Sequence, residues 1–156
     1  MKPKRFGIGA LLLLFSAGIC RGEGLQIETS NAALQRLFDT AMERAAANLR
    51  DYADGRRVLV EGDIWNGLWL ETQPMGGVMY GKCDPVVAIN NMNVIMEGQR
   101  DDGLLPAMTE LNGNRWYGSL GMNMVAAYGL EVYYLLDEDR DFLQRLYATL
   151  ERYDLS

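Results

Sequence analysis

Two long segments that are apolar on most faces of a helix limit most strongly how this chain can fold. The first, residues 86–99, reads VVAINNMNVIMEGQ, and the second covers about residues 120–136. A helix of this kind must be enclosed by other parts of a protein, because it has no polar face to turn toward water. A chain of 156 residues offers little material for enclosing both. We therefore expect the chain to be the opening part of a larger helical protein.

Polar residues before and within the first apolar segment indicate how this helix starts and what it contacts. Asp84 is placed to cap the helix, and Pro85 would occupy the first helical position, where proline is favoured. Asn90, Asn91 and Asn93 would be buried together with the helix. Buried amides need hydrogen-bond partners, so we expect these three to find partners inside the protein.

Two amphipathic helices are expected outside this pair. Apolar residues recur at helical spacing along residues 31–50, after Ser30 as a candidate N-cap, and again along residues 142–153 after a turn that reads DEDRD. We expect the first to be a surface helix with one side packed inward. The second should be amphipathic and outward-facing.

The segments between these helices favour loops, turns and one short strand. Residues 56–62 could form the strand, whereas residues 67–77 predict a loop, because Pro74, Gly76 and Gly77 interrupt a helical pattern. A turn is expected at Asp102 and Gly103, and an aromatic loop at residues 112–118. The predicted fold class is therefore all-α, with an irregular aromatic and acidic loop.

The N-terminus has the pattern of a secretory signal peptide at residues 1–22. Basic residues precede an apolar run, residues 6–19, that is too short to span a membrane. This favours a periplasmic or extracellular location, without a stable membrane span after cleavage. A lipoprotein anchor at Cys20 is the less favoured alternative, because Ile19 stands where a small residue is preferred. After cleavage Cys83 is the single thiol, which excludes an internal disulfide.

The charge and the residue types limit the chemistry that the chain can carry out. The net charge is −6 and the 15 lysines and arginines are scattered, which argues against nucleic-acid binding. The chain has no histidine, the commonest metal ligand and general base. We expect no metal and no cofactor, and any acid–base chemistry must come from aspartate and glutamate.

The strongest candidate site combines acids with tryptophans between residues 61 and 71. Glu61, Asp63 and Glu71 lie close in sequence to Trp65 and Trp69. Carboxylates accept hydrogen bonds from sugar hydroxyls, and indole faces stack on the apolar faces of sugar rings, so this combination suits a carbohydrate site. In the alternative interpretation, the tryptophans fill the core and the acids pair with nearby basic residues, which are Arg56, Arg57 and Lys82.

A second aromatic segment repeats the combination on a smaller scale. Arg115, Trp116 and Tyr117 follow one another, with Glu110 and Asn112 nearby. Packing is the commoner role of such a segment. We nevertheless include Arg115 and Trp116 among the candidate substrate-binding residues.

Four motifs in fixed order resemble a known family. They are ETQPMGGVMYGK from Glu71, the Asp84-Pro85 pair, the helix with Asn90 and Asn91, and QRDDGLLP from Gln99. Together they resemble the start of the catalytic domain of six-hairpin glycosidases, bacterial glycoside hydrolases akin to the amylo-α-1,6-glucosidase, trehalase and glucosidase-I group. The resemblance covers about residues 30–153. It implies that residues 23–156 form the first helical hairpins of an (α/α)6 toroid.

The resemblance also implies an activity. Such enzymes hydrolyse glycosidic bonds of oligo- or polysaccharides with inversion, using two carboxylates. The catalytic acid and base usually lie on later hairpins, here beyond Ser156. The early aromatic loop lines the subsite for the non-reducing sugar, which implies substrate-binding roles for Trp69 and Glu71, with Asp63 and Trp65 close by.

Two other interpretations stay open. One is a polysaccharide lyase or sugar epimerase on a similar toroid, in which Tyr80, Tyr117 and Arg115 would act. The other is a non-catalytic helical module that binds a sugar or a partner protein.

Overall fold

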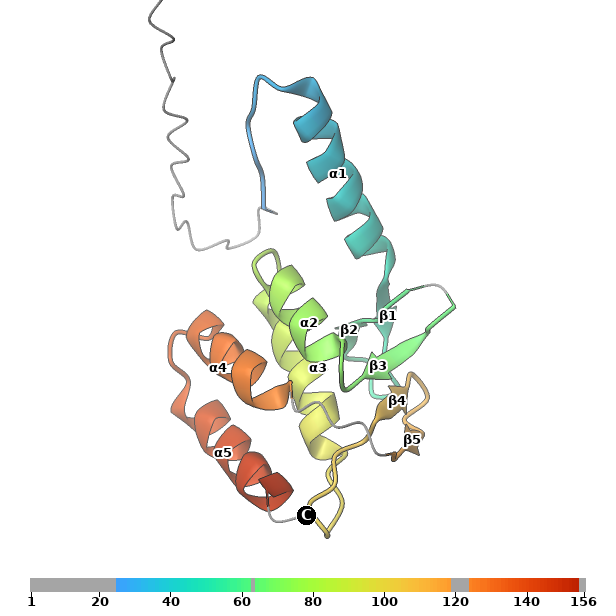
Figure 1. Ribbon diagram of the computed structural model, residues 1–156, viewed down its shortest axis with the longest axis vertical. Coiled ribbons are helices and arrows are strands. Elements are labelled where there is room, and N and C mark those ends of the chain that lie inside the picture. The colour runs from blue at the N-terminus through green and yellow to red at the C-terminus, as the bar shows by residue number, and fades with distance from the viewer. Residues whose placement is uncertain (1–24, 63, 119–123, 155–156) are drawn as a thin grey trace, which may run out of the picture.

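The structure is a computed structural model that describes residues 25–62, 64–118 and 124–154, and it shows helices and small sheets in these ranges (Figure 1). The helices are α1 (Ala32–Ala47), α2 (Gln73–Gly81), α3 (Pro85–Glu97), α4 (Val125–Leu135) and α5 (Arg140–Asp154). The strands are β1 (Leu49–Asp51), β2 (Arg57–Leu59), β3 (Gly67–Trp69), β4 (Met108–Glu110) and β5 (Arg115–Trp116). The proposed signal peptide and Cys20 lie outside the described residues.

The predicted all-α fold, with the hairpins of an (α/α)6 toroid, is wrong. The described residues form a mixed α/β arrangement with two antiparallel sheets, one of order β1-β2 and one of order β3-β4-β5. Segments expected to be irregular loops instead exchange backbone hydrogen bonds. The turns of both hairpins contain a glycine with positive φ, Gly55 at 85° and Gly113 at 91°, a conformation that other residues rarely adopt. The expected strand at residues 56–62 is confirmed as β2.

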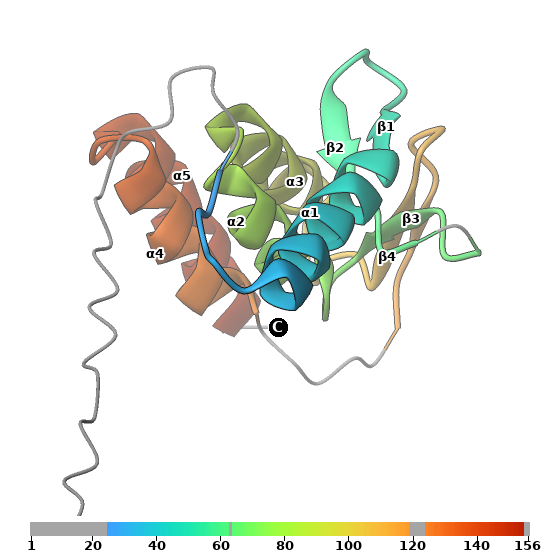
Figure 2. The ribbon, with the colours of Figure 1, turned by 90° about the horizontal axis from the view of Figure 1, so that it is seen from above.

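The elements form three layers. Seen from above, α2 and α3 lie in the middle, α4 and α5 lie on one side of them, and the sheets lie on the other (Figure 2). The larger group of buried side chains lies between the helices and includes Met92, Ile95, Phe142 and Leu146. A smaller group beneath the sheets contains Tyr52, Val58, Leu68 and Val94. Helix α3 contributes to both groups, which explains why it is apolar on most faces.

Helix α3 begins as predicted. The Asp84 side chain accepts a hydrogen bond from the Val86 backbone N–H at 3.1 Å, and Pro85 is in the first turn. Two of its three asparagines are buried and have the expected partners, whereas Asn93 is half-buried and makes no side-chain hydrogen bond with another described residue. The Asn91 amide accepts from the Leu59 N–H and donates to the Leu59 carbonyl, both at 2.9 Å, and Asn90 donates to the Arg57 carbonyl at 2.9 Å. These two side chains therefore bind helix α3 to strand β2.

Helix α2 occupies a segment that we expected to begin as a loop. Its proline, Pro74, falls in the first turn, where the missing N–H costs no helical hydrogen bond. Its glycines allow close contact with α3. A Cβ atom at Gly77 would lie 2.9 Å from Asn91 Cβ, and one at Gly81 would lie 2.6 Å from Ala88 Cβ. Gly77, which was expected to interrupt a helix, instead lets α2 approach α3 closely.

Helix α1 differs from the expectation of an inward-packed side. Its N-cap is Asn31, one residue after the predicted Ser30, and the Asn31 side chain accepts from the N–H groups of Ala33 and Leu34. None of its residues is buried, and Leu37 is 67 % exposed. Figure 1 shows this helix standing away from the other elements. Its apolar stripe is therefore covered only in part, where Leu25 and Ile27 line a cavity together with Phe38 and Met42.

The last helix is amphipathic, as predicted. Phe142, Leu146 and Thr149 are buried, and Tyr147 on the other side is 66 % exposed. The Asp139 side chain caps the start of α5, since it accepts from the N–H groups of Asp141 and Phe142. Within the described ranges, no helix is both long enough and apolar enough to cross a membrane.

Candidate functional site

The sheet of β3, β4 and β5 places a row of large side chains on one face. Trp69 pairs with Met108 across β3 and β4, and Met108 pairs with Trp116 across β4 and β5. Successive residues of a strand point to opposite sides. Leu68 and Thr109 therefore point to the other side, where both are fully buried. We call the side with Trp69, Met108 and Trp116 the outer face.

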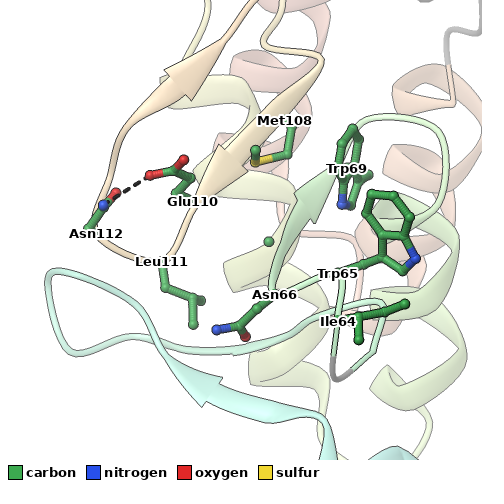
Figure 3. Close-up of a pocket in the computed structure, with 9 residues that line it drawn as sticks. Ile64, Trp65, Asn66, Trp69, Met108, Glu110, Leu111 and Asn112 are labelled. Atoms are coloured by element: carbon green, nitrogen blue, oxygen red, sulfur yellow. Dashed lines mark hydrogen bonds between the residues drawn. The ribbon is translucent and has the colours of Figure 1, made fainter.

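A groove of about 590 Å³ lies along this outer face. In Figure 3 the indoles of Trp65 and Trp69 stand on one side of the groove, and Glu110 and Asn112 stand on the other. The lining residues are Ile64, Trp65, Asn66, Gly67, Trp69, Met108, Glu110, Leu111 and Asn112. Gly67 forms part of its floor, and a Cβ atom there would lie 3.0 Å from the Met108 sulfur. The groove thus combines apolar, amide and carboxylate groups.

The two tryptophans are arranged at nearly a right angle. Their ring centroids are 5.6 Å apart and their planes meet at 80°, an edge-to-face geometry that aromatic rings prefer. Trp65 is 53 % exposed, so the alternative in which both rings fill the core does not hold for it. Trp69 is partly buried in β3 and supports Trp65 from behind. A large apolar surface is therefore held in place and accessible to a ligand.

Glu110 is fixed by three neighbouring donors. Its carboxylate accepts hydrogen bonds from Trp116 Nε1 at 3.0 Å, Asn112 Nδ2 at 3.0 Å and Asn114 Nδ2 at 3.1 Å. These bonds, the one from Trp116 first, lower the pKa of Glu110 below its usual range, because they stabilise the charged form. Asn112 is fixed as well, since its Oδ1 accepts from the Asn114 N–H at 2.9 Å. This side of the groove presents polar groups in a set arrangement.

A second cavity of about 350 Å³ adjoins the groove at the tryptophan pair. It is lined by Glu61, Trp65, Trp69 and Glu71. The expected alternative, in which these acids pair with nearby basic residues, is not seen within the described ranges. Arg56 instead pairs with Asp54 and Glu97. The side chains of Glu61 and Glu71 take part in no ion pair or side-chain hydrogen bond with another described residue.

The structure brings together some of the sequence-predicted residues and separates others. Trp65, Trp69 and Glu71 meet around the second cavity, whereas Asp63 lies outside the described residues. Trp116 does not line the groove but donates to Glu110, which does. Arg115 holds the register position of Thr109, on the opposite side from the outer face, and its Nε lies beside Gly98.

Tyr80 and Tyr117, the tyrosines of the lyase or epimerase interpretation, line neither the groove nor the second cavity. The Tyr117 hydroxyl donates to the Gly98 carbonyl at 2.8 Å, and the Arg100 guanidinium lies over its ring. Burial raises the pKa of Tyr80, which is the opposite of what a tyrosine base requires. Neither residue supports that interpretation.

Sequence reasoning missed Asn66 as a lining residue and did not include Glu110 or Asn112 among the candidate site residues. A signal for the last two was present, because Asn112-Gly113 is a strong sign of a tight hairpin. That turn pairs β4 with β5 and puts Glu110 diagonally opposite Trp116. No comparable signal indicated that Asn66 lines the groove, since this depends on the pairing of β3 with β4, about 40 residues later in the chain.

In the described part of the chain, no three side chains of the metal-binding types stand close enough together to hold an ion. Comparison of the chain with models of known protein families, with curated proteins and with solved structures found no match. The inference of function therefore depends on the groove itself and on the motifs in the sequence.

Proposed function

We propose that this chain binds a carbohydrate in the groove on the outer face of the β3-β4-β5 sheet, as part of a secreted glycoside hydrolase that acts on oligo- or polysaccharides. The observation that carries the proposal is Trp65. Its indole is half exposed, braced by Trp69, and lies at the edge of a groove that also contains amide and carboxylate groups.

The groove offers the two kinds of contact that a sugar needs. The apolar face of a pyranose ring packs on an indole, while its hydroxyls exchange hydrogen bonds with fixed polar side chains. Asn66 has an exposed amide that makes no hydrogen bond with another described residue, so its donors and acceptor are available to a ligand. Glu110 and Asn112 add groups that the hairpin already holds in position, which reduces the entropy lost on binding.

The hydrolase part of the proposal is supported by the carboxylates and by the resemblance of the sequence motifs. Glu61 and Glu71 adjoin the tryptophans, and their carboxylates are unpaired within the described ranges. Glu71 stands in the early aromatic segment that binds the non-reducing sugar in the family that the sequence resembles. Its role here is recognition of the substrate, with the catalytic pair elsewhere.

Titration with neutral tetrasaccharides of different linkage tests the binding function. We expect at least one of them to bind with millimolar or tighter affinity by calorimetry. Backbone amide signals of residues 64–69 and 108–112 should shift in NMR spectra, and those of α5 should not. Absence of binding by this set and by tetrasaccharides that carry amino groups, or shifts confined to other residues, would reject the groove as a sugar site.

The substitution Glu71→Gln tests the hydrolase role in the enzyme that contains this chain. We expect lower turnover or weaker substrate affinity, with an unchanged thermal unfolding curve. If the variant unfolds instead, Glu71 is a structural residue and its assigned role is wrong.

A further inference from the structure

The second cavity has a feature that binding of a neutral sugar does not require. Two carboxylates, Glu61 and Glu71, share a cavity of about 350 Å³ with two indoles, and neither carboxylate has a cationic partner among the described residues. Carboxylates without a cationic partner attract a cationic ligand. The cavity therefore has the electrostatic character of a cation site.

The tryptophans give this cavity a chemical preference among cations. Their rings meet at 80° with centroids 5.6 Å apart, so they form a corner that presents one ring face and one ring edge. The face of an indole attracts an ammonium group through its quadrupole, and proteins use such aromatic corners to bind organic ammonium ions. A small metal ion would need additional oxygen ligands, and the described residues provide no such cluster.

The cavity also adjoins the sugar groove. Trp65 and Trp69 line both, so a sugar that packs on these indoles in the groove lies next to the second cavity. This position favours an ammonium group that is carried by a bound sugar over a separate small cation.

We propose that the ligand of this groove is an oligosaccharide that contains an amino sugar with a free, protonated amine, and that the ammonium group occupies the cavity of Glu61, Glu71, Trp65 and Trp69. This inference rests on the proposed carbohydrate-binding function and names the class of its ligand. Glu61 and Glu71 supply the opposite charge, and the indoles exclude water from one side of the ammonium group. Acetylation of the amine removes its charge and abolishes these contacts.

The test compares three probes on the same protein: a glucosamine tetramer, the corresponding N-acetylglucosamine tetramer and tetramethylammonium. We expect the free-amine tetramer to bind about tenfold or more tightly than its acetylated form, as one charge-assisted contact would give. The double substitution of Glu61→Gln and Glu71→Gln should remove most of this difference. Glu131→Gln on α4 deletes a carboxylate far from the cavity in sequence and serves as the control, with the difference retained.

The possible results distinguish a failure of this inference from a failure of the proposed function. Equal affinity for both tetramers would overturn the ammonium site while leaving carbohydrate binding intact. Absence of binding by either tetramer and by the neutral tetrasaccharides would overturn both. Tetramethylammonium binding as tightly as the free-amine tetramer would show that the cavity does not select a sugar. The comparison of the two tetramers uses the unaltered protein, so it remains decisive even if the double variant does not fold.

Discussion

The contact between α2 and α3 and the outer face of the β3-β4-β5 sheet use similar polar residues in opposite ways. In the helix pair, Asn91 is fully buried, and both the oxygen and the nitrogen of its amide bind the backbone of Leu59. On the outer face, Asn66 is exposed and its amide has no partner among the described residues. The contrast teaches that an amide whose partners lie within the chain holds the fold together, whereas an amide without them is available for a ligand.

The largest effect is expected from removal of the buried amide. Asn91→Ala leaves the N–H of Leu59 without a partner in the interior and opens a small cavity. We expect a loss of about 2–4 kcal/mol in the free energy of unfolding, measured by denaturant titration.

The matched control for this substitution is Asn66→Ala. It removes the same side chain from an exposed position, so the free energy of unfolding should change by less than about 0.5 kcal/mol, while sugar affinity falls. Similar losses of stability in both variants would show that the contrast between the two regions is wrong.

The close helix contact provides the second test. In Gly81→Ala, the new Cβ atom would meet Ala88 Cβ at 2.6 Å and a Leu135 methyl carbon at 3.0 Å. We expect a net destabilisation of about 1–2 kcal/mol, despite the higher helix propensity of alanine, because the helices must move apart. Thermal unfolding measures it, and Gly62→Ala is the control, since a Cβ atom there has nothing within 4 Å. An unchanged or more stable Gly81 variant would contradict the need for close approach.

A substitution on the outer face should change sugar affinity and leave the free energy of unfolding nearly unchanged. Trp65→Ala removes the half-exposed indole, and we expect sugar affinity to fall by about 1–3 kcal/mol, as for other stacked aromatic residues. The matched control is Tyr147→Ala on α5, an aromatic side chain of similar exposure that lines neither cavity. Calorimetry measures the sugar affinity of both variants, and only Trp65→Ala should bind more weakly. A loss of stability in Trp65→Ala without a loss of affinity would make this residue part of the core.

The sequence allowed several local features to be predicted because each depends on neighbouring residues. The Asp84 cap, the strand at residues 56–62 and the turn at Asp102 and Gly103 follow from chemistry within a few positions. The need for partners around Asn90 and Asn91 also followed from their apolar surroundings. Trp65, Trp69 and Glu71 were expected near one another because they are close in sequence, and they line one cavity.

Other features depended on contacts between distant segments and could not be derived in this way. The pairing of β3 with β4 joins residues 67–69 to residues 108–110, and no local pattern specifies it. Gly77 was interpreted as a helix breaker, because its advantage appears only when Asn91 lies against it. The apolar stripe of α1 indicated packing, but periodicity shows which side of a helix is apolar and not whether another element covers it.

The smallest effect concerns the protonation of Glu110, which links the sheet to the groove. Three hydrogen bonds lower its pKa in the folded state, and the bond from Trp116 contributes most. A carboxyl group whose pKa is lower in the folded state stabilises the fold above its unfolded pKa, and this contribution is lost as the pH falls through the folded pKa. NMR titration of the Glu110 side-chain carbon should therefore give a midpoint below the usual value for a glutamate. Trp116→Phe keeps an aromatic ring but removes the donor, and it should raise the midpoint toward the usual value. If the midpoint does not move, the Trp116 bond does not hold this carboxylate, and the polar side of the groove is less fixed than the tryptophan side.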